Sequence, residues 1–175
     1  NKSEQTQHFN EAMIAVHGTE PGAFAAAYDF TGLRKVVDVG GGTGNLLTHL
    51  LLANPHLEGV LYDRPDVAGD ARREIERKGL AERCEMIEGS FFESVPPNGD
   101  AYILSHVLHD WDDENCLKIL GQCHKAMRGK GRLIVLEELI PPGNNQHPAK
   151  FADLLMLAVT NGGRERGQQE YAALF

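Results

Sequence analysis

The sequence has little of what marks several large classes of protein. Its three cysteines, Cys84, Cys116 and Cys123, form no C-x-x-C pair, so neither a disulfide framework nor a zinc ribbon is indicated. No stretch approaches the roughly 18 apolar residues of a membrane span, and the polar first residues are unlike a signal peptide. Positive charge is scarce: 17 Lys and Arg against 25 Asp and Glu give a net charge of −8, which disfavours nucleic-acid binding. We therefore expect a cytoplasmic protein with buried free thiols.

What the sequence does contain is an alternation of β-branched runs with helix-forming segments. Strands are predicted at 35–39, 59–62, 84–87, 101–105 and 133–136. Helices are predicted at 45–53, 65–78, about 112–129, 149–159 and 168–174, after two short helices within 9–28 that are separated at 18–22. This order predicts an α/β fold, a Rossmann-like and mostly parallel sheet with helices on both faces.

The strongest local signal is a loop with four glycines in the five residues 40–44, which follows the first predicted strand and Asp38. A phosphate-binding P-loop would need Gly-Lys-Ser/Thr, which does not follow. A dinucleotide fingerprint would need glycine at Asn45. Ordinary strand-to-helix turns rarely use so many glycines, so we interpret the loop as a place where a ligand approaches the backbone closely.

Two further candidates lie at the same edge of the predicted sheet. Asp63 follows Gly44 by nineteen positions and ends the second strand, where a carboxylate can accept the ribose hydroxyls of a nucleoside. His109 follows the fourth strand and is a candidate general base, because imidazole titrates near neutral pH. The structural alternatives are a turn residue for Asp63 and a capping or interface residue for His109. His106 could share a helical face with His109, but no third ligand has suitable spacing, so we predict no metal site.

Carboxylates near the end of the fifth strand and beyond it complete the set of candidates. Glu137 ends that strand, and Glu165 lies in a glycine-rich segment further along. A carboxylate in such a place can orient a histidine and stabilise its charged form. Glu138 is interpreted as solvated, and Asp110, Asp112 and Asp113 as residues that favour the start of a helix.

Several of these segments together resemble one enzyme family, the S-adenosylmethionine-dependent O-methyltransferases of the caffeate/hydroxyindole type. The resemblance lies in VDVGGGTG at 37–44, YDRP at 62–65, GSFF at 89–92 and LHDW at 108–111. The segments IVLE at 134–137, DLLML at 153–157 and GGRER at 162–166 fit the same family. The match runs in order from about residue 9 to residue 175.

The resemblance implies a class I methyltransferase that uses S-adenosyl-L-methionine, releases S-adenosyl-L-homocysteine and methylates a hydroxyl of a small aromatic acceptor. It implies His109 as the general base, flanked by Glu137 and Glu165. The implied cofactor contacts are Asp38, Gly40, Gly42, Gly44, Asp63, Arg64, Ser90, Phe91 and Ser105. The implied acceptor contacts are Asp110, Met156 and Thr160. At Ser90 the family commonly has Asp, and at Ser105 plant members often have Lys, so the lining of the adenine end is expected to differ.

The resemblance also implies that the chain is one portion of a longer enzyme. Residues 1–30 would be a helical lead-in from an N-terminal dimerisation region, and residues 31–175 a catalytic domain without its final strand pair. The full-length protein would be a homodimer with no nucleic-acid or membrane partner. The alternatives are a cofactor-binding scaffold without activity and an NAD-dependent oxidoreductase, the latter disfavoured by Asn45. The acceptor is not encoded recognisably in the loop at 144–147.

Overall fold

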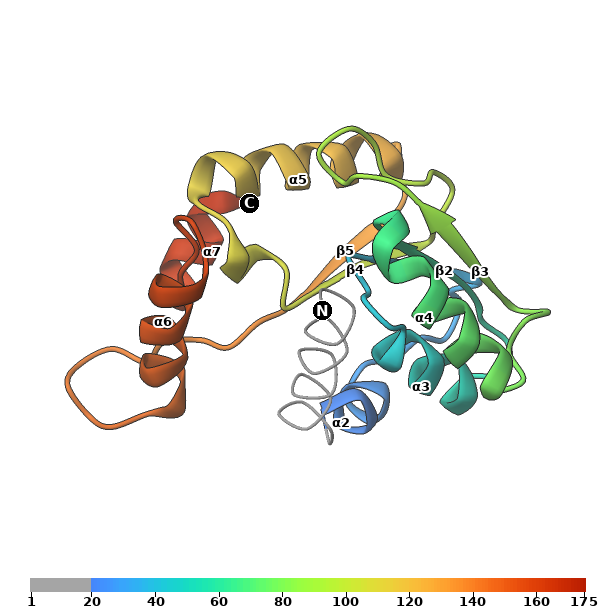
Figure 1. Ribbon diagram of the computed structural model, residues 1–175, viewed down its shortest axis with the longest axis horizontal. Coiled ribbons are helices and arrows are strands. Elements are labelled where there is room, and N and C mark those ends of the chain that lie inside the picture. Colours follow the sequence, from blue (N-terminus) through green and yellow to red (C-terminus); the bar gives the residue numbers. More distant parts are fainter. Residues whose placement is uncertain (1–19) are drawn as a thin grey trace.

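Five parallel strands form a single sheet in the computed structural model, which describes residues 20–175 (Figure 1). The strands are β1 (Lys35–Val39), β2 (Glu58–Asp63), β3 (Cys84–Glu88), β4 (Ala101–Ser105) and β5 (Arg132–Leu136). Their order across the sheet is β3-β2-β1-β4-β5, and each neighbouring pair is parallel. The chain thus winds outward from β1 to β3 and returns to β4 beside β1. In parallel sheets, ligands bind outside the carboxyl ends of the strands at such a reversal.

The helices confirm the predicted fold class and most of the predicted boundaries. They are α2 (Glu20–Ala27), α3 (Asn45–Ala53), α4 (Pro65–Arg77), α5 (Asp113–Met127), α6 (Pro148–Val159) and α7 (Gln168–Leu174), with a 3-10 turn η1 (Leu108–Asp110). The break between two helices that the sequence predicted at residues 18–22 is wrong in its last residues, because α2 already begins at Glu20. Pro21 is tolerated there since the first turn of a helix needs no N–H partner. The helix expected before residue 18 lies outside the described residues.

Alternation along the strands divides the core into two layers. Val36, Leu61 and Ile103 face the layer that contains the leucines of α3. Their sequence neighbours Val37 and Leu104 face the layer that contains α5. The two layers arise because successive side chains of a strand point to opposite faces of the sheet. Figure 1 shows α3 and α4 on one side of the sheet and α5 on the other.

Two expectations drawn from the composition can be compared with the described residues. All three cysteines are free and buried, as predicted. Of the helices described, none has the length and apolar character needed to cross a bilayer.

A single buried hydroxyl joins the loop before β4 to α5. Tyr102 on β4 is fully buried, and its hydroxyl accepts the Gly99 N–H at 3.0 Å. The same oxygen lies 3.1 Å from the carbonyls of Pro96 and Ala126, to either of which it can donate. Its removal would leave the partly buried Gly99 N–H without this acceptor and the buried Ala126 carbonyl without this donor.

We expect Tyr102→Phe to lower the free energy of unfolding by about 1–3 kcal/mol, because the partly buried Gly99 N–H loses its acceptor and the buried Ala126 carbonyl loses a donor. Urea denaturation followed by circular dichroism measures the change. Tyr28→Phe is the matched control, since the Tyr28 hydroxyl makes no hydrogen bond among residues 20–175. A Tyr102→Phe protein as stable as the parent would show that the hydroxyl is not needed.

Candidate active site

The glycine loop leaves β1 at the reversal of the sheet and packs tightly on one side. Gly40, Gly42 and Gly44 have φ values of 74°, 59° and 81°, which favour glycine. A Cβ on Gly40 would lie 2.9 Å from Val107 Cγ2 and 3.3 Å from the Phe91 ring. At Gly42 the same position has no heavy atom of residues 20–175 within 4 Å. The loop is therefore closed against its neighbours at Gly40 and open at Gly42.

The end of β2 is fixed against this loop through the Asp63 carboxylate, whose predicted role in ribose binding stays a prediction. The Gly42 N–H donates to Asp63 Oδ2 at 2.8 Å, and the Arg64 N–H donates to Oδ1 at 2.7 Å. The Arg64 side chain is directed elsewhere: its Nε donates to Asp66 at 2.9 Å, and the side chain is 67% exposed. The backbone of Arg64, rather than its guanidinium, thus contributes to this arrangement.

Asp38 is a buried carboxylate at the base of the loop. It is 1% exposed, and neither of its oxygens has a hydrogen-bond partner within the described part of the chain. Burial, and then the charge of Asp63, raises the pKa of Asp38 to about 7. A desolvated anion in this position would be stabilised by a ligand that brings a positive charge.

The segment after β3 places an aromatic ring beside the loop. Phe91 packs edge-to-face against Phe92 and Trp111, with ring centroids 5.0 and 6.1 Å away. The Ser90 hydroxyl accepts the Phe92 N–H at 3.3 Å, so it also supports the local turn. Ser105 is the last residue of β4 and pairs with Leu136 of β5.

His109 lies on η1, which follows β4 at the same edge of the sheet. Its side chain is 12% exposed, and its Nδ1 lies 3.0 Å from Glu165 Oε1 and 3.4 Å from Glu137 Oε2. Because an ionised carboxylate can only accept, Nδ1 carries the proton that Glu165 binds. Nε2 is then the free basic nitrogen, and Asp110 Oδ1 lies 3.7 Å from it.

The two glutamates near His109 have different tasks. Glu165 makes the closer contact with the imidazole. Glu137 Oε1 accepts the N–H groups of Val107 and Leu108 at 3.1 and 2.8 Å, and so holds the start of η1. Burial raises the pKa of Glu137, and its other oxygen has no hydrogen bond among the described residues. The family resemblance implied that both glutamates flank His109. It did not indicate that one binds the imidazole and the other binds backbone N–H groups.

His106 does not share a helical face with His109, contrary to the sequence interpretation. Its φ is 53°, so the chain turns sharply before η1 begins. The two rings are nevertheless 5.5 Å apart, and His106 Nε2 lies 2.8 Å from Glu20 Oε2 on α2. Glu137 supplies the third potential ligand that local spacing did not reveal, since ligand atoms of His106, His109 and Glu137 lie within 4.8 Å of one another. The absence of a metal stays a prediction.

The two acceptor candidates on α6 lie at its last turn. Thr160 follows the helix, and its hydroxyl donates to the Met156 carbonyl at 2.8 Å and accepts the Gly163 N–H at 2.9 Å. Met156 is half-buried. Their part in acceptor binding stays a prediction.

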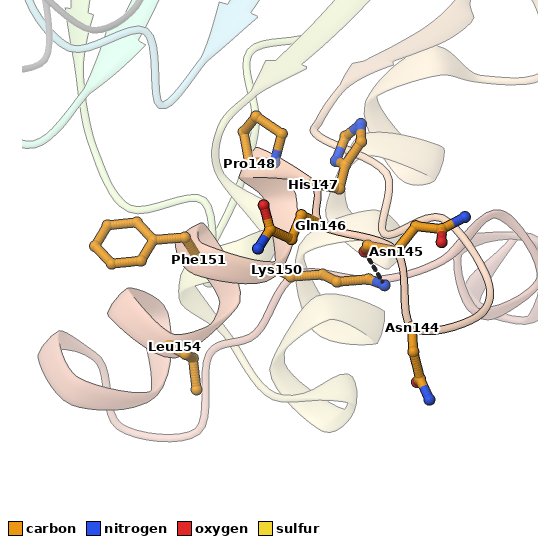
Figure 2. A pocket seen from close by; sticks show the side chains of 8 residues that line it. All are labelled: Asn144, Asn145, Gln146, His147, Pro148, Lys150, Phe151 and Leu154. Carbon is orange, nitrogen blue, oxygen red and sulfur yellow. Dashed lines mark hydrogen bonds between the residues drawn. The ribbon is translucent and has the colours of Figure 1, made fainter.

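A separate pocket of about 560 Å³ lies between the loop after β5 and the start of α6 (Figure 2). It is lined by Asn144, Asn145, Gln146, His147, Pro148, Lys150, Phe151 and Leu154. Lys150 donates to the Asn145 carbonyl at 2.7 Å, the bond drawn in Figure 2. None of the residues described around His109 and the glycine loop lines this pocket.

Comparison with known proteins gives a consistent result. The family model described as O-methyltransferase domain matches residues 1–175. A mitomycin biosynthesis 6-O-methyltransferase of Streptomyces lavendulae is 47% identical over 169 residues, which cover 95% of this chain and 47% of that protein. The solved structure of a mitomycin 7-O-methyltransferase superposes with a TM-score of 0.93 at 45% identity, covering 99% of this chain and 51% of that one.

A second solved structure was determined with ligands. An O-methyltransferase from neocarzinostatin biosynthesis, in complex with S-adenosylmethionine and 2-hydroxy-5-methyl naphthoic acid, has a TM-score of 0.82 at 38% identity. The match covers 93% of this chain and 48% of that one. The chain thus spans about half the length of the curated relatives and solved structures that it matches.

We expect Asp38→Asn to remove a pH-dependent loss of stability. In the folded protein the pKa of Asp38 is about 7, whereas in the unfolded chain the carboxyl releases its proton near the ordinary pKa of 3.8. The parent protein therefore loses stability as pH rises between these values, by at most roughly 4 kcal/mol. Thermal unfolding at pH 5 and pH 8 should show a smaller difference for Asp38→Asn. Asp70→Asn on the surface is the control, and a variant that keeps the full pH difference would contradict the assignment.

We expect Glu165→Gln to lower the pKa of His109. Burial opposes the charged imidazole, but the hydrogen bond with Glu165 and the charges of Glu137 and Asp110 raise the pKa of His109 above its usual value. Without the Glu165 charge, the imidazolium should lose its proton at lower pH. Histidine ring signals followed by NMR across the titration measure the shift. Exposed Glu138→Gln should leave it unchanged, and equal effects of the two substitutions would argue against the pairing.

Proposed function

The chain belongs to the O-methyltransferase domain family, and from that premise we propose that the protein transfers a methyl group from S-adenosylmethionine to a hydroxyl of a small aromatic acceptor. The observation that carries the proposal is His109, held through Nδ1 by Glu165 at the reversal of the sheet, next to a glycine loop. A base and a ligand-binding loop at one edge suit a reaction that aligns two bound molecules.

The residues around the loop fit this cofactor, which carries a sulfonium and an ammonium group. The Asp38 carboxylate, which has no hydrogen-bond partner within residues 20–175, favours a cationic ligand. Asp63, oriented by two backbone N–H groups, would accept the ribose hydroxyls. The proposed set is completed by Gly40, Gly42, Gly44, Arg64, Ser90, Phe91 and Ser105, with the Phe91 ring along the adenine.

When bound, the cofactor would supply a methyl group already activated by the sulfonium charge. The chain's own task is then to position the acceptor, exclude water and remove a proton. His109 Nε2 would take the proton of the acceptor hydroxyl, while Glu165 holds the opposite nitrogen at 3.0 Å. The charge that develops on the imidazole would be balanced by Glu165 and Glu137. No step in this scheme needs a metal ion.

Support for an aromatic acceptor comes from a solved structure in complex with 2-hydroxy-5-methyl naphthoic acid and from a relative named as a 3-amino-4-hydroxybenzoate 4-O-methyltransferase. Asp110 Oδ1 lies 3.7 Å from the basic nitrogen of His109. Met156 and Thr160 are hydrogen-bonded to each other at the end of α6. We include these three residues as the proposed acceptor contacts.

We further propose that the longer protein is a cytoplasmic homodimer in which residues 31–175 form the cofactor-binding domain and residues 1–30 lead into it. Support comes from α6, which exposes a set of large apolar side chains: Phe151, Leu154, Leu155, Leu157 and Val159, each 45–75% exposed. Apolar surface of this kind marks an interaction site.

We expect His109→Ala to lower turnover by roughly 10²–10⁴ while the affinity for S-adenosylhomocysteine stays the same, because a general base contributes to the chemical step alone. Turnover is measured in the full-length protein, and affinity by calorimetric titration with NAD as the control ligand. Micromolar binding of S-adenosylhomocysteine and none of NAD is expected. NAD binding would favour an oxidoreductase, and unchanged turnover would remove His109 from the role of base.

A further inference from the structure

Arg166 is fully buried, and it takes no part in the chemistry described above. Its guanidinium has five N–H donors, and the structure gives five acceptor contacts. Nε and Nη2 donate to Asp113 Oδ1 at 3.1 and 2.8 Å, and Nη2 also donates to the Trp111 carbonyl at 2.7 Å. Nη1 donates to the carbonyls of Leu108 and Arg164 at 2.9 and 3.3 Å. Every donor of the buried charge is therefore used.

Two of these carbonyls bracket His109. Leu108 precedes it on η1 and Trp111 follows the turn, so Arg166 fixes the backbone on both sides of the base. Arg166 is also the residue after Glu165, whose carboxylate binds the imidazole. One side chain thus joins the segment that carries His109 to the segment that carries its partner.

The same two segments approach each other closely at a second place. A Cβ on Gly163 would lie 2.4 Å from the His109 carbonyl oxygen and 2.7 Å from the Asp110 carbonyl carbon, so only glycine fits there. The Gly163 N–H is held by the Thr160 hydroxyl. This contact sets the distance between the segments independently of Arg166.

The backbone of Arg166 extends the connection to the third segment of the site. Its carbonyl accepts the Ile140 N–H at 3.1 Å, and it forms a parallel bridge with Leu139. These residues follow Glu137 at the end of β5. Arg166 therefore touches all three segments that supply His109, Glu137 and Glu165.

We propose that Arg166 is a positioning residue that, together with Asp113, holds His109 against Glu165. The inference rests on the proposed function, in which His109 is the base. Arginine suits the task because its planar fork reaches two carbonyls and a carboxylate at once, which the single ammonium of lysine cannot do. A charge buried this deeply is tolerated only when its donors are satisfied, so the geometry around it is narrowly defined.

The test compares Arg166→Met, Arg166→Lys and Asp113→Asn with the control Arg164→Met. Arg164 is a matched control because it contacts the same Asp113 at 3.1 Å, yet its side chain is 40% exposed and its hydrogen bonds within residues 20–175 go to Asp113 and Glu170. Three quantities are measured in the full-length protein: kcat against pH, the pKa of His109 by NMR, and the Kd for S-adenosylhomocysteine. The titratable groups that face His109 are Glu165, Glu137, Asp110 and His106, whose ring lies 5.5 Å away, and all four are unchanged in every variant.

For Arg166→Met we expect kcat to fall roughly 10- to 100-fold, since a displacement of about 1 Å has effects of this size. A looser contact with Glu165 should lower the pKa of His109 and move the acid limb of the kcat profile to lower pH. The Kd for S-adenosylhomocysteine should stay within about twofold. Arg166→Lys should keep part of the kcat that Arg166→Met loses. Asp113→Asn should lower kcat and the pKa of His109 by smaller amounts than Arg166→Met. Arg164→Met should have the kcat and the His109 pKa of the parent.

An unchanged His109 pKa in the Arg166 and Asp113 variants would overturn the proposal, whether or not kcat falls. If Arg166→Met does not fold, Asp113→Asn and Arg166→Lys decide by the same criterion. A His109 pKa that responds to these substitutions in a protein without methyl transfer would support the positioning role and overturn the proposed function instead.

Discussion

The need to satisfy charges away from water is the constraint on which this site depends. Glu165, Glu137 and Arg166 are almost completely buried side chains, and a buried charge is stable only with close partners. Glu165 binds the imidazole of His109, Glu137 binds two backbone N–H groups, and Arg166 binds a carboxylate and three carbonyls. Because these bonds join three segments of the chain, the position of His109 is determined by many contacts. Asp38 differs, because neither of its carboxylate oxygens has a hydrogen-bond partner in the part of the chain that the structure describes.

The fold brings the two halves of the site together through one topological feature. The glycine loop follows β1 and η1 follows β4, and these strands are neighbours only because the winding reverses between them. The contact of Gly40 with Val107 is the direct result. The proposed base and the proposed cofactor loop therefore lie on separate segments of the chain and still reach the same edge of the sheet. The pocket beside α6 belongs to a different part of the surface, formed by residues 144–154.

Membership of the O-methyltransferase family agrees with this geometry. The chain covers about half of its relatives, yet the glycine loop, Asp63, His109 and both glutamates all lie within it. The apolar face of α6 lies outside the core and is consistent with a role in contacts made by the longer protein.

The sequence by itself determined the strands, most helix boundaries and the glycine loop, because hydrophobic periodicity and glycine conformation are local properties. It also indicated His109, Glu137 and Glu165, although chiefly through a family resemblance. Only the tertiary structure decided that Glu165 binds the imidazole while Glu137 holds η1, that His106 turns away from a helical face, and that Arg166 joins the segments. The bonds of Glu137, Glu165 and Arg166 join residues 29 to 58 positions apart, and the bond of His106 to Glu20 spans 86 positions, so the path of the folded backbone determines these partners. Local patterns carry no information about that path.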